Sequence, residues 1–182
     1  MRIVRRYDTS SRRVALLQAM DHLEAARAAV ARATEHLSSA DARDEVLAVL
    51  THRRLRGDTF VLVERVWRLG VLLLGRGGTL YATGTTLRID ELKFDNHQSN
   101  LAAARREYRA AALRAGFRKG ETVNFDATPL ELDAGLARSD GPVVLTPEGV
   151  QVRWSAASAA LAPLESYLAE RVELLADPPP GA

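Results

Sequence analysis

The stretch of residues 60–89 constrains the fold more than any other part of the chain. It is rich in β-branched and aromatic residues, and the glycine turn at 76–78 interrupts it in the middle. Two such runs on either side of a glycine turn are typical of a β-hairpin. Because residues 69–74 are apolar on both faces of a strand, we predict that the first limb is a central strand covered on both sides.

Two glycines, Gly70 and Gly84, lie inside this predicted hairpin. Glycine weakens a strand and often marks a point where another group approaches the backbone closely. A three-residue loop would place Gly70 opposite Gly84, whereas a two-residue turn would place it opposite Thr85. In the first register the two glycines form a notch, which a packed helix, a tryptophan ring such as that of Trp154, or a ligand can fill. We therefore take Gly70, Gly84 and Trp154 as candidate binding residues.

The first part of the chain, residues 1–57, is predicted to be an arm followed by a helical hairpin. A long helix begins at Ser10 or Ser11, and neither glycine nor proline occurs before Gly57. Asp41 is a suitable N-cap for a second helix, which the basic residues 52–56 would end. The first helix carries a seven-residue repeat of large and small apolar residues: Leu16, Ala19, Leu23, Ala26, Val30, Ala33 and Leu37.

This repeat has two interpretations. It is either a seam against the second helix of the same chain or the contact of a homodimer through the N-terminal helix. Three heptads are too few to decide between them.

The remaining chain predicts an α+β domain over residues 58–176. A helix over 101–115, a strand over 121–127, a second hairpin over 143–154 and a helix from Pro163 follow the first hairpin. Hairpin-joined strands with helices on their faces indicate a mostly antiparallel sheet of about five strands covered by helices. Residues 177–182, with three consecutive prolines, are expected to form a disordered tail.

Composition excludes several classes of function. The chain has no cysteine, which rules out disulfides, thiolate nucleophiles and cysteine-based metal sites. The net charge of +2 is too small to favour a nucleic-acid-binding domain. Arg68 interrupts the longest apolar run, so no membrane span is expected, and a cytoplasmic protein without a cofactor is the plain interpretation.

Candidate catalytic residues are few. His97 follows Asp95 in a polar loop before a predicted helix, and such a pair can act as a general base or supply two metal ligands. Helix capping and ordinary loop polarity explain the same residues. Arg105 and Arg109 share one flank of the helix over 101–115, where they form either a binding surface or a solvated basic face.

Four segments (66–75, 80–84, 119–125 and 152–155) resemble a family of small uncharacterised proteins from GC-rich bacteria. The resemblance covers roughly residues 60–176, and it implies the glutaminase label that some members carry. The residues argue against that activity, because the chain lacks both a cysteine nucleophile and a Ser-x-x-Lys motif. We therefore expect a non-catalytic binding or assembly module, with a glutaminase-like amide hydrolase as the alternative.

Overall fold

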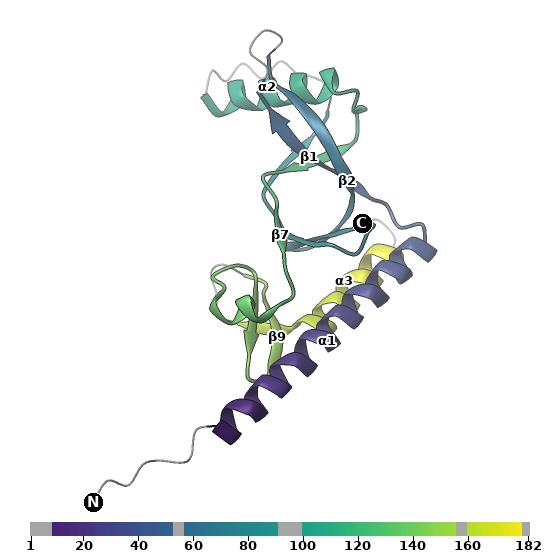
Figure 1. Cartoon of the computed structure of the whole chain (residues 1–182). Coiled ribbons are helices and arrows are strands. Elements are labelled where there is room, and N and C mark those ends of the chain that lie inside the picture. Colours follow the sequence, from purple (N-terminus) through teal and green to yellow (C-terminus); the bar gives the residue numbers. More distant parts are fainter. Residues whose placement is uncertain (1–8, 53–56, 91–99, 156–159, 180–182) are drawn as a thin grey trace, which may run out of the picture.

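The computed structural model describes residues 9–52, 57–90, 100–155 and 160–179 (Figure 1). Its described part is α+β, and none of its helices is long and apolar enough to cross a membrane. The helices are α1 (Thr9–Ser39), α2 (Asn100–Arg114) and α3 (Leu164–Ala176), with a 3₁₀ turn at Ala134–Arg138. The strands are β1 (Glu45–Thr51), β2 (Thr59–Leu69), β3 (Leu72–Gly75), β4 (Leu80–Ala82), β5 (Thr85–Arg88), β6 (Thr122–Phe125), β7 (Thr128–Leu130), β8 (Val143–Thr146), β9 (Gly149–Arg153) and β10 (Leu161–Pro163).

The larger sheet has seven strands in the order β5-β6-β1-β2-β3-β4-β7. All neighbours are antiparallel except β1 and β6, which are parallel. Only two residues separate β4 from β5, and two separate β6 from β7, although these strands lie toward opposite ends of the order. The sheet must therefore curl until its ends meet, and Figure 1 shows the resulting ring.

The predicted sheet, mostly antiparallel with about five strands, was wrong. The sheet is mixed and seven-stranded, and a separate three-stranded sheet has the order β10-β9-β8. Two chain segments account for part of the difference, because each bends once and contributes two strands. One segment forms β4 and β5, and the other forms β6 and β7. The two segments pair in a single antiparallel register, which runs from Leu80 opposite Leu130 to Thr85 opposite Phe125.

The predicted second helix, and with it the N-terminal helical hairpin, was also wrong. Residues 45–51 form β1, which pairs with β2 in the same sheet, so residue 57 lies between two paired strands. Asp41 does not begin a helix but follows the end of α1, with a positive φ of 48°. The Ala42 N–H donates to the Leu37 carbonyl (3.1 Å) and the Asp41 N–H donates to the Ser38 carbonyl (3.3 Å), which is a Schellman ending.

The first limb of the predicted hairpin is two strands rather than one. Gly70 and Val71 form a two-residue turn between β2 and β3, and Gly70 has a φ of +64°. A positive φ at the first turn residue is typical of tight hairpin turns. Beyond this turn, Leu72 of β3 pairs with Ala82 of β4. This is the register that a three-residue loop at 76–78 predicts, the one in which Gly70 would lie opposite Gly84.

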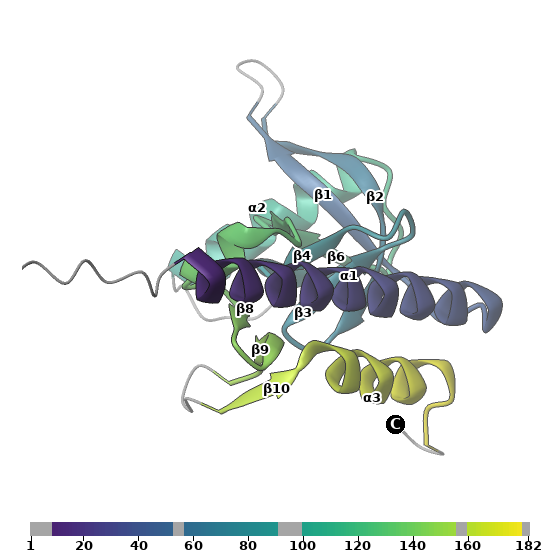
Figure 2. The same cartoon turned by 60° about the horizontal axis from the view of Figure 1, so that its bottom comes forward.

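The other local predictions are confirmed within a few residues: the break of the first helix near Ser39, α2, β6, the β8–β9 hairpin and α3. Helices α1 and α3 run side by side (Figure 2) and pack on one side of the ring together with the small sheet. Leu23, Val30 and Leu37 are buried there, so this part of the α1 repeat is an intramolecular seam, although its partner is α3 rather than a second N-terminal helix.

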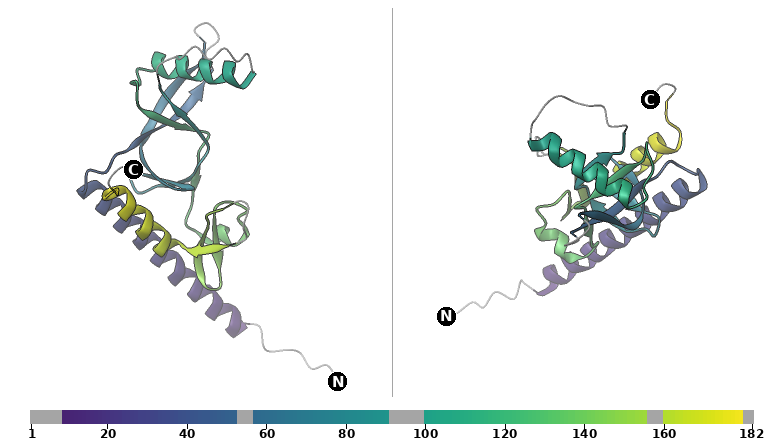
Figure 3. Two further views of the ribbon diagram at one scale, coloured as in Figure 1. Left: turned by 180° about the vertical axis from the view of Figure 1, so that it is seen from behind. Right: turned by 90° about the horizontal axis from the view of Figure 1, so that it is seen from above.

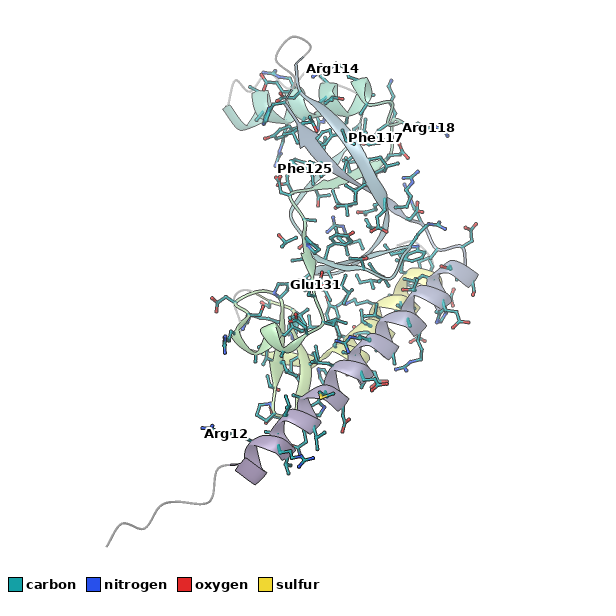
Figure 4. The ribbon with its side chains drawn as sticks, in the orientation of Figure 1. Arg12, Arg114, Phe117, Arg118, Phe125 and Glu131 are labelled. Atoms are coloured by element: carbon teal, nitrogen blue, oxygen red, sulfur yellow. The ribbon has the colours of Figure 1, made fainter. Side chains whose placement is uncertain are left out.

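Helix α2 covers the opposite end of the ring (Figure 3). It packs over β1, β2, β5 and β6 through buried Ala111 and Ala112. The side chain of Phe125 on β6 is buried in the apolar cluster beneath α2, and Phe117 packs against that cluster (both labelled in Figure 4). The rings of Phe60 and Tyr108 each meet that of Phe125 edge-on at 5.1 Å. The ring of strands is therefore held between α2 and the α1–α3 pair.

Candidate functional site

Side-chain alternation along β2 divides its residues between the two faces of the curled sheet. Arg65, Trp67 and Leu69 alternate with Glu64, Val66 and Arg68, as the pleat requires. Trp67 and Leu69 belong to the core under α1 and α3. Val66 instead packs with Leu47 and Leu73 in a separate cluster, which also contacts Tyr81 and Ala127. Glu64, Val66 and Arg68 therefore face the inside of the ring. There the apolar cluster around Val66 forms a layer that separates the carboxylate of Glu64 from the guanidinium of Arg68.

Arg68 joins three strands across the ring. Its Nε donates to Glu45 Oε2 on β1 (3.1 Å), and one terminal nitrogen donates to Thr86 Oγ1 on β5 (2.7 Å) and to Asn124 Oδ1 on β6. Asn124 is 1% exposed, and its Nδ2 donates to Glu45 Oε2 (2.7 Å) and to the Val46 carbonyl (3.2 Å). A buried amide with both its ends hydrogen-bonded fixes the guanidinium in one position. We call these four side chains, Glu45, Arg68, Thr86 and Asn124, the Arg68 network.

Beyond the apolar layer, Tyr81 donates its hydroxyl hydrogen bond to Glu64 Oε1 at 2.6 Å. Burial, together with this bond and the negative charge of Glu64, raises the pKa of Tyr81 to about 12. The glycine at position 75 leaves room for Glu64, because a Cβ there would lie 2.3 Å from Glu64 Oε2. This pair closes the inside of the ring on the side away from the Arg68 network.

Ion pairs continue from the Arg68 network onto the rim of the ring. Arg65 binds Glu121 (2.8 Å) and lies 3.8 Å from Asp44, which Arg76 also binds (2.7 Å). Partial burial alone would raise the pKa of Glu121. The Arg118 backbone N–H and the Arg65 side chain donate hydrogen bonds to Glu121, and the guanidinium charges of both residues also favour the carboxylate. Together these effects outweigh burial and hold the pKa of Glu121 below its usual value. Glu121 is therefore an ionised partner and a weak base.

A hollow of about 270 Å³ opens at this rim, where β1 and β6 begin and β5 ends. We call it the rim hollow. Its lining, as far as the described residues form it, holds no imidazole, thiol or amine, and it consists of Arg43, Asp44, Glu45, Arg65, Arg68, Arg88, Gly120, Glu121, Thr122 and Leu175. Four guanidinium groups and three carboxylates give the lining a net charge of +1. Such a lining suits recognition of an anion better than nucleophilic chemistry.

The catalytic candidates His97 and Asp95 lie outside the described residues. Arg105 is exposed on α2, and Arg109 is half-buried with its Nε buried and without a hydrogen-bond partner among the described residues. Neither arginine lines the rim hollow.

The two hairpin glycines accommodate protein atoms. A Cβ on Gly70 would lie 2.2 Å from the hydroxyl of Tyr167 on α3, and a Cβ on Gly84 would lie 2.4 Å from backbone atoms of Asp126. The space beside Gly70 is thus filled by a packed helix, one of the fillings expected from the sequence. Trp154, which follows β9, is 48% exposed and fills neither position.

Sequence reasoning missed the residues that do meet, Glu45, Arg68 and Asn124. One signal was present, since Arg68 stands in an otherwise apolar strand region and a charge there needs a buried partner. Nothing in the sequence identified the partner. Comparison with protein-family models, curated proteins and solved structures finds no match to this chain.

Proposed function

We propose that this protein is a non-catalytic binding module whose rim hollow takes a small anionic molecule bearing a carboxylate or a phosphate. The observation that carries the proposal is the set of four guanidinium groups around one hollow. Arginine is the side chain best suited to carboxylate and phosphate, because its planar donors bind two oxygens at once.

The four arginines divide into two kinds. Arg65 and Arg68 are held by carboxylates of the same lining and, for Arg68, by Asn124, so they form a fixed wall whose charge is largely neutralised. Arg43 has neither a hydrogen bond nor an ion pair within the described chain, and Arg88 binds Asp90, which does not line the hollow. Arg43 and Arg88 therefore keep donors for a ligand, while Arg65 and Arg68 hold the lining carboxylates in place.

The chemistry of the hollow favours binding over hydrolysis. Among the lining residues the acidic groups Asp44, Glu45 and Glu121 are ion-paired, and the lowered pKa of Glu121 makes it a poor proton acceptor. An amide hydrolase needs an activated nucleophile or an activated water. The volume is slightly below that of typical drug-sized ligand sites, which fits a small metabolite-sized anion.

The test is calorimetric titration of the full chain with inorganic phosphate and, separately, with succinate, at low ionic strength. Arg43→Gln should weaken binding by about tenfold or more, since a charge-assisted hydrogen bond contributes about 1.5–3 kcal/mol. The stability of the Arg43→Gln variant should stay near wild type, because Arg43 is exposed and has no partner among the described residues to lose.

Arg105→Gln on α2 is the matched control, since it removes the same charge from an exposed surface away from the hollow. If Arg105→Gln weakens binding and Arg43→Gln does not, the anion binds on α2 and the assignment to the rim hollow is wrong. Failure of both anions to bind at millimolar concentration overturns the binding function. Enzymatic release of ammonia from glutamine would overturn the non-catalytic assignment.

A further inference from the structure

The N-terminal turns of α1 carry an apolar surface that the rest of the described chain leaves exposed. Val14, Leu16, Leu17 and Met20 are exposed by 52%, 59%, 54% and 56% of their surface. The burial of the α1 repeat begins only at Leu23. Figures 1 and 3 show this end of α1 projecting beyond the small sheet. Four large, half-exposed side chains within seven residues form a patch of the kind that marks an interaction site.

Charged residues frame this surface with a definite pattern. Arg13, Leu17, Met20 and Glu24 are spaced four, three and four residues apart, so they lie in one row along the helix. The row begins with a positive charge, continues with two apolar side chains and ends with a negative charge. Neither Arg13 nor Glu24 takes part in an ion pair in the described part of the molecule.

We propose that a second copy of this chain packs antiparallel on this row, with the two-fold axis between Leu17 and Met20. Reversing the direction of an identical row places Leu17 of each copy against the other copy's Met20. The same operation places Arg13 of each copy opposite the other's Glu24. The row is thus complementary to itself in both apolar contact and charge, as an isologous interface requires.

The heptad spacing supports this register. A coiled-coil seam has two kinds of position, a and d, which alternate at spacings of three and four residues. In an antiparallel helix pair each a position of one helix packs against a d position of the other, and the spacing of four, three and four in this row provides such an alternation. The segment is short, so the interface falls below the roughly 1,200 Å² of total buried surface found in standard complexes. The dimer is therefore reversible and concentration-dependent.

Sedimentation velocity of the wild-type chain at concentrations up to about 1 mM should show a monomer–dimer equilibrium, and an affinity of that order is what a small interface supports. Leu17→Glu should yield a folded monomer, because Leu17 is exposed and contributes little to the core. Gln18→Glu is the matched control, since it introduces the same charge on the face of the helix turned away from the row. Circular dichroism checks that each variant folds.

A charge exchange tests the register itself. Arg13→Glu and Glu24→Arg should each weaken self-association by about tenfold or more, because each places like charges opposite one another twice. Mixing these two single variants should restore dimerisation, since every carboxylate then again meets a guanidinium. A wild type that stays monomeric overturns the proposal. So does a dimer that Leu17→Glu leaves intact, or a mixture of the two charge variants that associates no better than either alone.

Discussion

Gly70 and Tyr167 are predicted to be coupled through one hydroxyl group. Tyr167 donates this hydroxyl to the Leu69 carbonyl (2.9 Å) and accepts from the Val71 N–H (3.1 Å), so it holds α3 to the β2–β3 turn. A Cβ at Gly70 would lie 2.2 Å from the hydroxyl oxygen, and Gly70 has a φ of +64°. Gly70→Ala must displace the hydroxyl and accept a left-handed backbone.

The expected cost is about 3 kcal/mol of unfolding free energy. The two hydrogen bonds contribute about 1 kcal/mol each, and a left-handed conformation costs a non-glycine residue about 1 kcal/mol. In a Tyr167→Phe background the hydroxyl is already absent, and the nearest remaining ring atom, Cζ, lies 3.4 Å from the added Cβ. Gly70→Ala should then cost only about 1 kcal/mol, for the backbone alone.

Urea unfolding of the four proteins, wild type, the two single variants and the double variant, measures this difference directly. The predicted coupling energy is about 2 kcal/mol, well above the error of such a cycle. If Gly70→Ala costs the same with and without the tyrosine hydroxyl, the close approach of α3 to this turn is not what requires glycine.

Three further predictions concern the ring. Gly84→Ala should destabilise the protein strongly and Gly77→Ala hardly at all, because a Cβ meets the Asp126 backbone at 2.4 Å in the first case and nothing within 4 Å in the second, as thermal melting would show. Tyr81 has a raised pKa of about 12, so its stabilising contribution is complete below about pH 10 and is lost as the pH rises toward 12. Ultraviolet titration should therefore show a late phenol that Tyr81→Phe removes. Glu121 has a lowered pKa, so its contribution is present above about pH 4.3 and is lost as the pH falls further. Glu121→Gln should flatten the acid side of the stability curve.

Elements with their own local signals were predictable from the sequence. Helix α2 ends where Gly116 follows it with a φ of +87°, and the β8–β9 turn reaches Gly149 with a φ of +128°. Each of these endings depends on residues only a few positions away along the chain. The apolar stripe of α3 likewise buries Leu164, Leu168 and Val172, as a helical period requires.

The error at β1 shows what local signals cannot decide. Residues 46–50 are a short apolar run, and periodicity alone does not distinguish a buried strand from a helix of that length. The acidic residues before it, Asp44 and Glu45, suited a helix N-terminus. In the structure they serve other purposes, since Asp44 binds Arg76 and Glu45 binds Arg68. The tertiary ion pairs explain these carboxylates, and no helix dipole is needed.

The rim hollow was beyond prediction because it depends on ring closure. Glu45 and Asn124 are 79 positions apart, and they meet because β1 and β6 pair in parallel and place Leu47 beside Asn124. That pairing fixes which face of the sheet each side chain of the two strands takes. Val46 and Val123 turn toward α2, while Glu45 and Asn124 turn toward Arg68. A one-residue slip in this single parallel pair would reverse both faces of β6, burying Asn124 under α2 and removing the amide that fixes Arg68. The wall of the hollow at Arg68 therefore depends on the same register that builds the apolar core beneath α2, so the fold and the candidate site depend on the same residues.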